Sequence, residues 1–142
     1  MDSPKKTPTG GTYTGCIIST TDFYGNVVEL SKATWETHIT PFHKEMAGRI
    51  VPVKITIEKP SLIIRSSSFN NRLIFQASNL LLPRQNLVRV VVQYEDIVKA
   101  LAGNSVGDVV TAFAPGPDKE FQGNLGDIIY QKPRPSRKKR KR

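Results

Sequence analysis

The sequence predicts an α+β domain in which helices near the N-terminus pack on one face of an antiparallel sheet. Helix signals concentrate in residues 31–48, and four or five β-prone segments follow residue 60. Short turns join those segments, which favours antiparallel pairing because a parallel crossover needs a dozen or more residues. Separation of helices from strands along the chain is typical of the α+β class.

The N-terminal part opens on β-prone residues before the helix signals begin. Residues 13–19 are β-prone, and the Gly25-Asn26 step that follows is compatible with a small hairpin or turn. Ser31 then provides an N-cap for a helix that ends before Pro41, because the residue preceding a proline avoids the α region.

Prolines bear on two further segments. A second short helix can begin at Pro41 and end at Gly48. Residues 51–59 are ambiguous: their apolar residues alternate as in a strand, whereas Pro52 and Pro60 suit the start and the end of a helix. The residues alone leave both alternatives open.

Strand signals dominate the second half of the chain. Apolar and β-branched residues recur in short runs, and turn-forming residues such as those at 68–71 separate the runs. The expected strands lie in segments 62–68, 72–78, 86–96, 108–115 and 125–131, with loops at 102–107 and 115–126.

Charge divides the chain into a near-neutral body and a basic C-terminal segment. The 142 residues include 21 basic and 12 acidic ones, a net charge of +9. Residues 131–142 hold eight of the basic residues and no acidic one, so the remainder has a net charge of +1. We therefore predict a flexible lead (1–12), a single domain (13–130) and a disordered basic tail (131–142) that attracts nucleic acid without a shaped site. The candidate phosphate contacts in the tail are Arg137, Lys138, Lys139 and Arg140.

The composition argues against membrane and secreted proteins. No apolar run approaches the roughly 20 residues that span a bilayer. The lysines near the N-terminus are not followed by the apolar segment of a secretory signal. The single cysteine, Cys16, excludes an intramolecular disulfide and is compatible with a reducing compartment. We expect a cytoplasmic protein with no membrane partner.

The two histidines, His38 and His43, are the side chains best suited to proton transfer near neutral pH. Cleavage of RNA by its own 2′-hydroxyl needs a base, an acid and cations for the phosphate, which two histidines and nearby arginines supply without metal. Judged from their spacing alone, it is commoner for two such histidines to be ordinary helix residues without a catalytic role. A zinc site is not expected, because this spacing does not place both rings on successive helix turns and no Cys or carboxylate cluster accompanies them. No other cofactor is expected.

Three arginines and one threonine lie in the expected strands. Strand alternation can direct Arg65, Arg72 and Arg89 toward one face, where their planar guanidinium groups bind phosphate. The hydroxyl of Thr111 can donate a hydrogen bond to a phosphate oxygen. The alternative is that the three arginines are exposed strand residues and that Thr111 is an ordinary β-prone threonine.

A series of short motifs runs through residues 22–130. A Trp-x-x-His-Ile helix has a second histidine nearby, and an Ile-x-x-Pro-x-x-Ile step, a Val-rich strand and a strand ending near Thr-Ala-Phe follow. In this order the motifs resemble the barnase–EndoU–colicin–RelE nuclease superfamily, in its phage- and mobile-element-associated branch. The basic tail is not part of the shared pattern.

The resemblance implies helices packed on a four-stranded antiparallel sheet, with residues 51–59 helical. It implies metal-independent cleavage of RNA through attack of the 2′-oxygen, with a cyclic phosphate product. Members often act as toxins, so the implied partners are RNA and an antitoxin or immunity protein. The matching positions make His38 and His43 the acid–base pair, Thr111 the hydroxyl on the penultimate strand, and Arg65 or Arg72 the phosphate clamp.

Two other functions remain open. The chain could be a catalytically silent nucleic-acid-binding module of the same fold, with the tail providing most of the affinity. It could also be an accessory protein of a phage particle that uses the tail to contact packaged nucleic acid. Neither function needs the two histidines to meet in one site.

Overall fold

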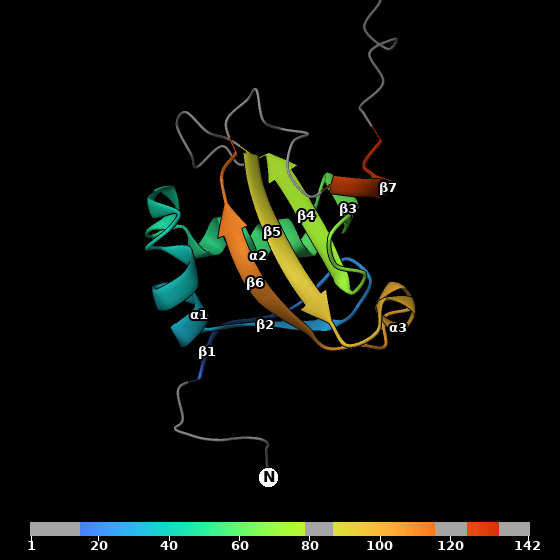
Figure 1. Cartoon of the computed structure of the whole chain (residues 1–142), viewed down its shortest axis with the longest axis horizontal. Coiled ribbons are helices and arrows are strands. Elements are labelled where there is room, and N and C mark those ends of the chain that lie inside the picture. Colours follow the sequence, from blue (N-terminus) through green and yellow to red (C-terminus); the bar gives the residue numbers. More distant parts are fainter. Residues whose placement is uncertain (1–14, 79–86, 116–124, 134–142) are drawn as a thin grey trace, which may run out of the picture.

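Seven strands form one mixed sheet in the computed structural model of the protein, which describes residues 15–78, 87–115 and 125–133 (Figure 1). Among these residues the strand order is β1-β2-β6-β5-β4-β3-β7, and each neighbouring pair is antiparallel except β2 and β6. The strands are β1 (Cys16–Thr21), β2 (Val27–Ser31), β3 (Leu62–Ser66), β4 (Arg72–Ser78), β5 (Leu87–Tyr94), β6 (Gly107–Phe113) and β7 (Leu125–Gln131).

The helices are short. A single turn, α1 (Lys32–Thr34), continues into the π-helical turn η1 (Trp35–Ile39). The second helix expected between residues 41 and 48 is reduced to one 3-10 turn, η2 (Lys44–Met46). Helices α2 (Ile50–Glu58) and α3 (Ile97–Leu101) follow, and α3 was not expected. None of the helices in the described part of the chain is long and apolar enough to cross a membrane.

The expected fold class, N-terminal helices packed on a four-stranded antiparallel sheet, is wrong. β3, β4, β5 and β6 do form a consecutive antiparallel set. However, the β1-β2 hairpin precedes the helices and extends the sheet at one edge, and β7 pairs with β3 at the other. The parallel pair β2-β6 joins segments that are far apart in the sequence. The short turns that predicted antiparallel pairing connect other strands and so did not indicate this pair.

The turn of the β1-β2 hairpin forms where the Gly25-Asn26 step suggested it. Gly25 has a φ of 98°, a conformation that glycine adopts without steric cost. The Asp22 carboxylate accepts hydrogen bonds from the backbone N–H groups of Tyr24 (2.8 Å) and Asn26 (2.9 Å). These bonds replace part of the strand pairing that ends at the turn.

Helix α2 resolves the ambiguity of residues 51–59 in favour of the helix that the resemblance implied. Pro52 lies in the first turn, where its missing N–H breaks no intrahelical hydrogen bond, and Pro60 follows the helix end. Val53 and Ile57 are fully buried and belong to the main core cluster. In Figure 1, α2 lies behind β4, β5 and β6, so it covers one face of the sheet.

The two faces of the central strands differ in chemistry. Val88, Val90 and Val92 of β5 are fully buried in the core against α2. The alternate residues of β5 point the other way, because successive side chains of a strand point to opposite faces. We call this second surface the polar face. Its members are Arg72, Ile74 and Gln76 of β4, Arg89, Val91 and Gln93 of β5, and Thr111 and Phe113 of β6.

The predicted lead, residues 1–12, lies outside the described residues, as does most of the 115–126 loop. The first two residues of the predicted tail belong to the ordered sheet. Gln131 is the last residue of strand β7, and the backbone N–H of Lys132 donates to the carbonyl of Ser61 at 2.8 Å. The residues from 134 onward, with Arg137, Lys138, Lys139 and Arg140, lie outside the described residues.

Candidate functional site

Two Arg–Gln pairs cross the centre of the polar face. Antiparallel register places Arg72 opposite Gln93 and Gln76 opposite Arg89. Arg72 donates through Nε to Gln93 Oε1 at 3.0 Å. Arg89 donates through Nε (3.1 Å) and Nη2 (2.7 Å) to Gln76 Oε1. Arg89 is only 3% exposed, whereas Arg72 is partly exposed, so Arg72 is the arginine of the two that a ligand can reach.

The short turns α1, η1 and η2 follow each other between residues 32 and 46, and we call them the helical segment. A groove of about 480 Å³ lies where the polar face meets this segment. Thr34 and His38 of α1 and η1, Arg72 and Gln93 of the central strands, and residues 109–111 of β6 line this groove. Three of the predicted site residues, His38, Arg72 and Thr111, therefore share one concave surface although they are distant in sequence. The fold brings a titratable ring, a guanidinium and a hydroxyl together.

The helical segment fixes His38 at the rim of the groove. Ser31 caps α1, its Oγ accepting a hydrogen bond from the Thr34 backbone N–H at 3.0 Å. Trp35 and Ile39 anchor η1 in the core, with 8% and 0% of their surfaces exposed. His38 lies between these two anchors in sequence and is exposed. Its backbone is thus held while its ring stays accessible.

His43 does not line the groove with His38. Its ring stacks on Phe113, with centroids 5.2 Å apart and planes inclined by 27°. Its Nδ1 lies 3.9 Å from Glu45 Oε2, which also accepts the Ala114 backbone N–H at 3.1 Å. Thr111 and Phe113 are two residues apart on β6 and so share the polar face, about 7 Å apart. Both histidines therefore lie along β6 on that face: His38 shares the groove with Thr111, and His43 stacks on Phe113.

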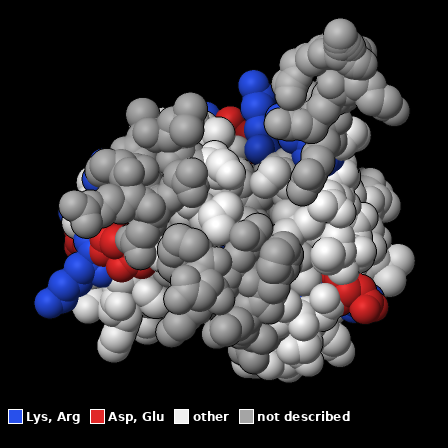
Figure 2. Space-filling model, turned by 90° about the horizontal axis from the view of Figure 1, so that it is seen from above, with Lys and Arg blue, Asp and Glu red and all other residues white. Residues whose placement is uncertain are grey.

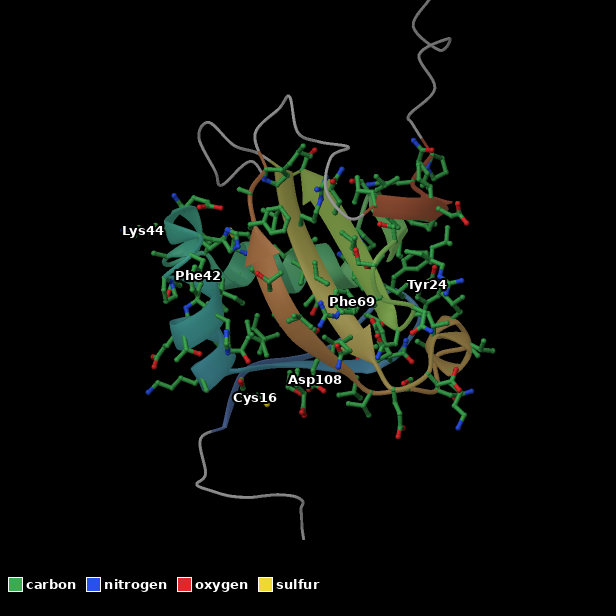
Figure 3. All side chains as sticks on the ribbon, viewed as in Figure 1. Cys16, Tyr24, Phe42, Lys44, Phe69 and Asp108 are labelled. Carbon is green, nitrogen blue, oxygen red and sulfur yellow. The ribbon has the colours of Figure 1, made fainter. Side chains whose placement is uncertain are left out.

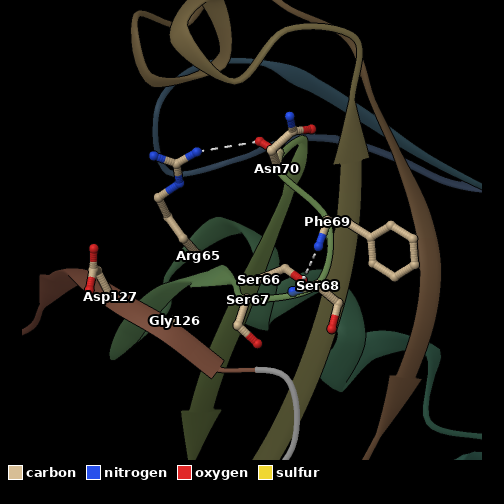
Figure 4. Close-up of a pocket in the computed structure, with 8 residues that line it drawn as sticks. All are labelled: Arg65, Ser66, Ser67, Ser68, Phe69, Asn70, Gly126 and Asp127. Carbon is tan, nitrogen blue, oxygen red and sulfur yellow. Dashed lines mark hydrogen bonds between the residues drawn. The ribbon is translucent and has the colours of Figure 1, made fainter.

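Arg65 lies in a different hollow, of about 560 Å³, at the turn between β3 and β4 (Figure 4). The hollow is lined by Arg65, residues 66–70, Gly126 and Asp127. Arg65 Nη2 donates to the Asn70 carbonyl at 3.4 Å, and the Asp127 carboxylate shares the hollow. Of the two arginines considered for the phosphate clamp, Arg72 shares the groove with His38 and Arg65 does not.

Charge on the described body is dispersed. On the face drawn in Figure 2, the Lys and Arg side chains stand in separate groups near the margins, with Asp and Glu close to them. This agrees with a body of nearly zero net charge. Within the described ranges, no three His, Cys, Asp or Glu side chains gather in a way that could hold a metal ion.

Sequence reasoning missed two residues of this surface. Gln93 orients Arg72, and Phe69 lies beneath it, with the guanidinium carbon 3.8 Å from the ring centroid. A signal for the glutamine was present: Arg-x-x-x-Gln occurs in both β4 and β5, and residues four apart share a strand face. Nothing in the sequence distinguished Phe69 from the other residues of its turn.

Comparison with models of protein families, with curated proteins and with solved structures found no match to this chain. The resemblance to the barnase–EndoU–colicin–RelE superfamily therefore stays a prediction. Inference about function rests on the groove and the polar face.

Proposed function

We propose that this protein is a metal-independent endoribonuclease. The observation that carries the proposal is the groove shared by His38, Arg72 and Thr111. Transfer of a phosphodiester needs a proton acceptor, a cation for the phosphate charge and a hydrogen-bond donor, and these three side chains supply one of each. The second imidazole, that of His43, stacks on Phe113, which lies two residues beyond Thr111 on the same face of β6.

In the proposed reaction, His38 accepts the proton of the ribose 2′-hydroxyl while the 2′-oxygen attacks the adjacent phosphorus. The bond from phosphorus to the 5′-oxygen breaks, and His43 donates a proton to that leaving oxygen. Arg72 binds the non-bridging oxygens and Thr111 donates a hydrogen bond to one of them. The products are a 2′,3′-cyclic phosphate and a free 5′-hydroxyl.

The first test is cleavage of tRNA and total RNA by the full-length protein in EDTA, with end-group analysis of the products. Substitution of His38 or His43 by alanine is expected to slow cleavage by about two to four orders of magnitude, the usual contribution of a positioned acid or base. The matched control is Glu36→Gln, an exposed residue of the same π-helical turn. Loss of activity in EDTA, or unchanged cleavage in both histidine variants, would overturn the mechanism.

A modified substrate separates the two histidine roles. When the leaving 5′-oxygen is replaced by sulfur, the thiolate departs without protonation. His43→Ala should therefore recover most of its lost rate on this substrate, whereas His38→Ala should remain slow. Equal recovery in the two variants would refute the assignment of base and acid.

A second candidate is nucleic-acid binding without cleavage. It is favoured by one observation, the packing of His43 against Phe113 outside the groove that His38 lines. This candidate predicts that RNA is bound and recovered intact, and that both histidine variants bind it as the parent protein does. The same cleavage experiment therefore decides between the two candidates.

The proposal extends to compartment and partner. An endoribonuclease of this kind would act on RNA in the cytoplasm, and a cell that makes it as a toxin would need an antitoxin or immunity protein to block the groove. Co-expression with a neighbouring open reading frame that restores growth would identify such a partner.

A further inference from the structure

We propose that Phe69 and Arg72 form a stacking platform for an unpaired nucleobase beside the groove, so that the preferred ligand is single-stranded RNA. The proposal deepens the proposed function, because it names the form of RNA that the groove would receive. It is carried by the contact between these two side chains and by the place of Arg72 in the groove wall.

The Phe69 ring is held at the surface. The guanidinium carbon of Arg72 lies 3.8 Å from the ring centroid and covers one ring face. The residue nevertheless keeps 47% of its surface exposed. A large aromatic side chain with an accessible π-face binds a base of any identity by stacking, and an adjacent arginine adds to this attraction.

The turn between β3 and β4 fixes the backbone that carries this ring. Ser66 Oγ accepts hydrogen bonds from the backbone N–H groups of Ser68 (3.2 Å) and Phe69 (3.1 Å). The backbone N–H of Arg72 lies 3.4 Å from the Phe69 carbonyl that accepts it. Binding of a base therefore orders little of the protein backbone, which lowers the entropic cost of association.

Arg72 connects the platform to the groove. Its Nε is engaged by Gln93, which sets the plane of the guanidinium, and its face rests on Phe69. Its remaining N–H donors lie at the edge of the group, where guanidinium binds phosphate oxygens. A nucleotide whose phosphate contacts this edge would have the neighbouring base near Phe69. Bases in a duplex remain stacked on each other, so only an unpaired base can use the platform.

The hollow beside the turn is a weaker candidate for the same ligand. Figure 4 shows the Phe69 ring pointing away from Arg65 and Asp127, which face that hollow. Arg65 already donates to the Asn70 carbonyl, and the Asp127 carboxylate repels phosphate. The Phe69 ring lies on the other side of the turn, where it contacts Arg72 of the groove wall.

Equilibrium binding without cleavage tests the platform. The full-length protein is titrated against a fluorescent 2′-O-methyl oligoadenylate, which cannot be cleaved by 2′-attack, and against an abasic oligomer of the same length. Phe69→Ala should weaken binding of the oligoadenylate by about tenfold to a hundredfold, the contribution of one stacked base, and leave abasic binding within twofold. Phe69→Trp should retain the affinity. Any contribution of the basic tail is the same for both ligands and cancels in the comparison.

Phe42→Ala is the matched control, because Phe42 is 73% exposed and lies on the helical segment, well away from Phe69 in Figure 3. It should affect neither ligand. An equal loss on both oligomers, or no loss on either, with Phe69→Ala would overturn the platform whether or not the protein cleaves RNA. A base-dependent loss in a protein that leaves natural RNA intact would keep the platform and reject the endoribonuclease.

Discussion

Replacing Tyr94 with phenylalanine tests the network that ties the N-terminal hairpin to the rest of the sheet. Tyr94 ends β5 and is 1% exposed, and its hydroxyl donates to Asp22 Oδ2 at 2.6 Å. Asp22 lies in the β1-β2 turn and is itself buried. Burial, together with the bond to Asp22, raises the pKa of Tyr94 far above its usual range, so the hydroxyl stays a neutral donor.

The magnitude follows from the partners of Asp22. A hydrogen bond to a charged acceptor contributes about 1.5–3 kcal/mol to stability. Asp22 keeps three other donors in the variant: the Tyr24 and Asn26 backbone N–H groups and the Asn26 side-chain amide at 3.0 Å. Its carboxylate is therefore not stranded, and we expect a loss of about 2 kcal/mol. For a chain of this size that loss lowers Tm by roughly 8 °C.

Urea denaturation provides the measurement, with the fluorescence of Trp35 as the reporter, since Trp35 is the single tryptophan and is buried. Tyr24→Phe is the control: it removes a tyrosine hydroxyl nearby but keeps the backbone N–H that binds Asp22, so it should stay within about 0.5 kcal/mol of the parent protein. A Tyr94→Phe variant equal in stability to this control would refute the reasoning.

Two further predictions concern charge. Partial burial and then the Glu29 carboxylate raise the pKa of Asp108, so the folded state holds this proton more tightly than the unfolded state does. Stability therefore falls as pH rises from the ordinary value of 3.8 through the raised pKa. Asp108→Asn should therefore stabilise the protein at pH 7 and change little near pH 3, as urea denaturation at both pH values can show; equal stabilisation at both would contradict it. Deletion of residues 134–142, which hold seven Lys or Arg, should flatten the log–log salt dependence of RNA binding by roughly 0.7 per lost phosphate contact and leave Tm unchanged. Identical slopes would show that the tail does not bind RNA.

The strands after residue 60 could be predicted because their signals are local. Alternating and β-branched residues set β3, β4, β5 and β6 close to the expected segments, and the 68–71 turn joins two of them. The overall topology could not be predicted in this way. β2 meets β6 through Val28 opposite Gly107, and no pattern within either segment encodes a partner so distant in sequence. The helical state of residues 51–59 was predicted only from the order of motifs that carries the resemblance, because these residues alone fit a strand equally well.

In the candidate site, too, the residue types could be read from the sequence, whereas the strand register that places them could not. Arg65, Arg72 and Arg89 are alike as strand arginines, and the sequence could not say which of them a phosphate would meet. Register separates them. Arg89 falls opposite Gln76, buried and 5.7 Å from the Phe113 ring, whereas Arg72 falls opposite Gln93 at the groove wall. The repeated Arg-x-x-x-Gln spacing, combined with antiparallel pairing, predicts both Arg–Gln pairs, but it does not say which pair is buried. Arg89 lies beside the Phe113 ring, on which His43 stacks, whereas Arg72 keeps part of its surface exposed. An anion reaching the polar face would therefore meet Arg72, with His38 and Thr111 beside it, and this makes the groove the part of the molecule to test first.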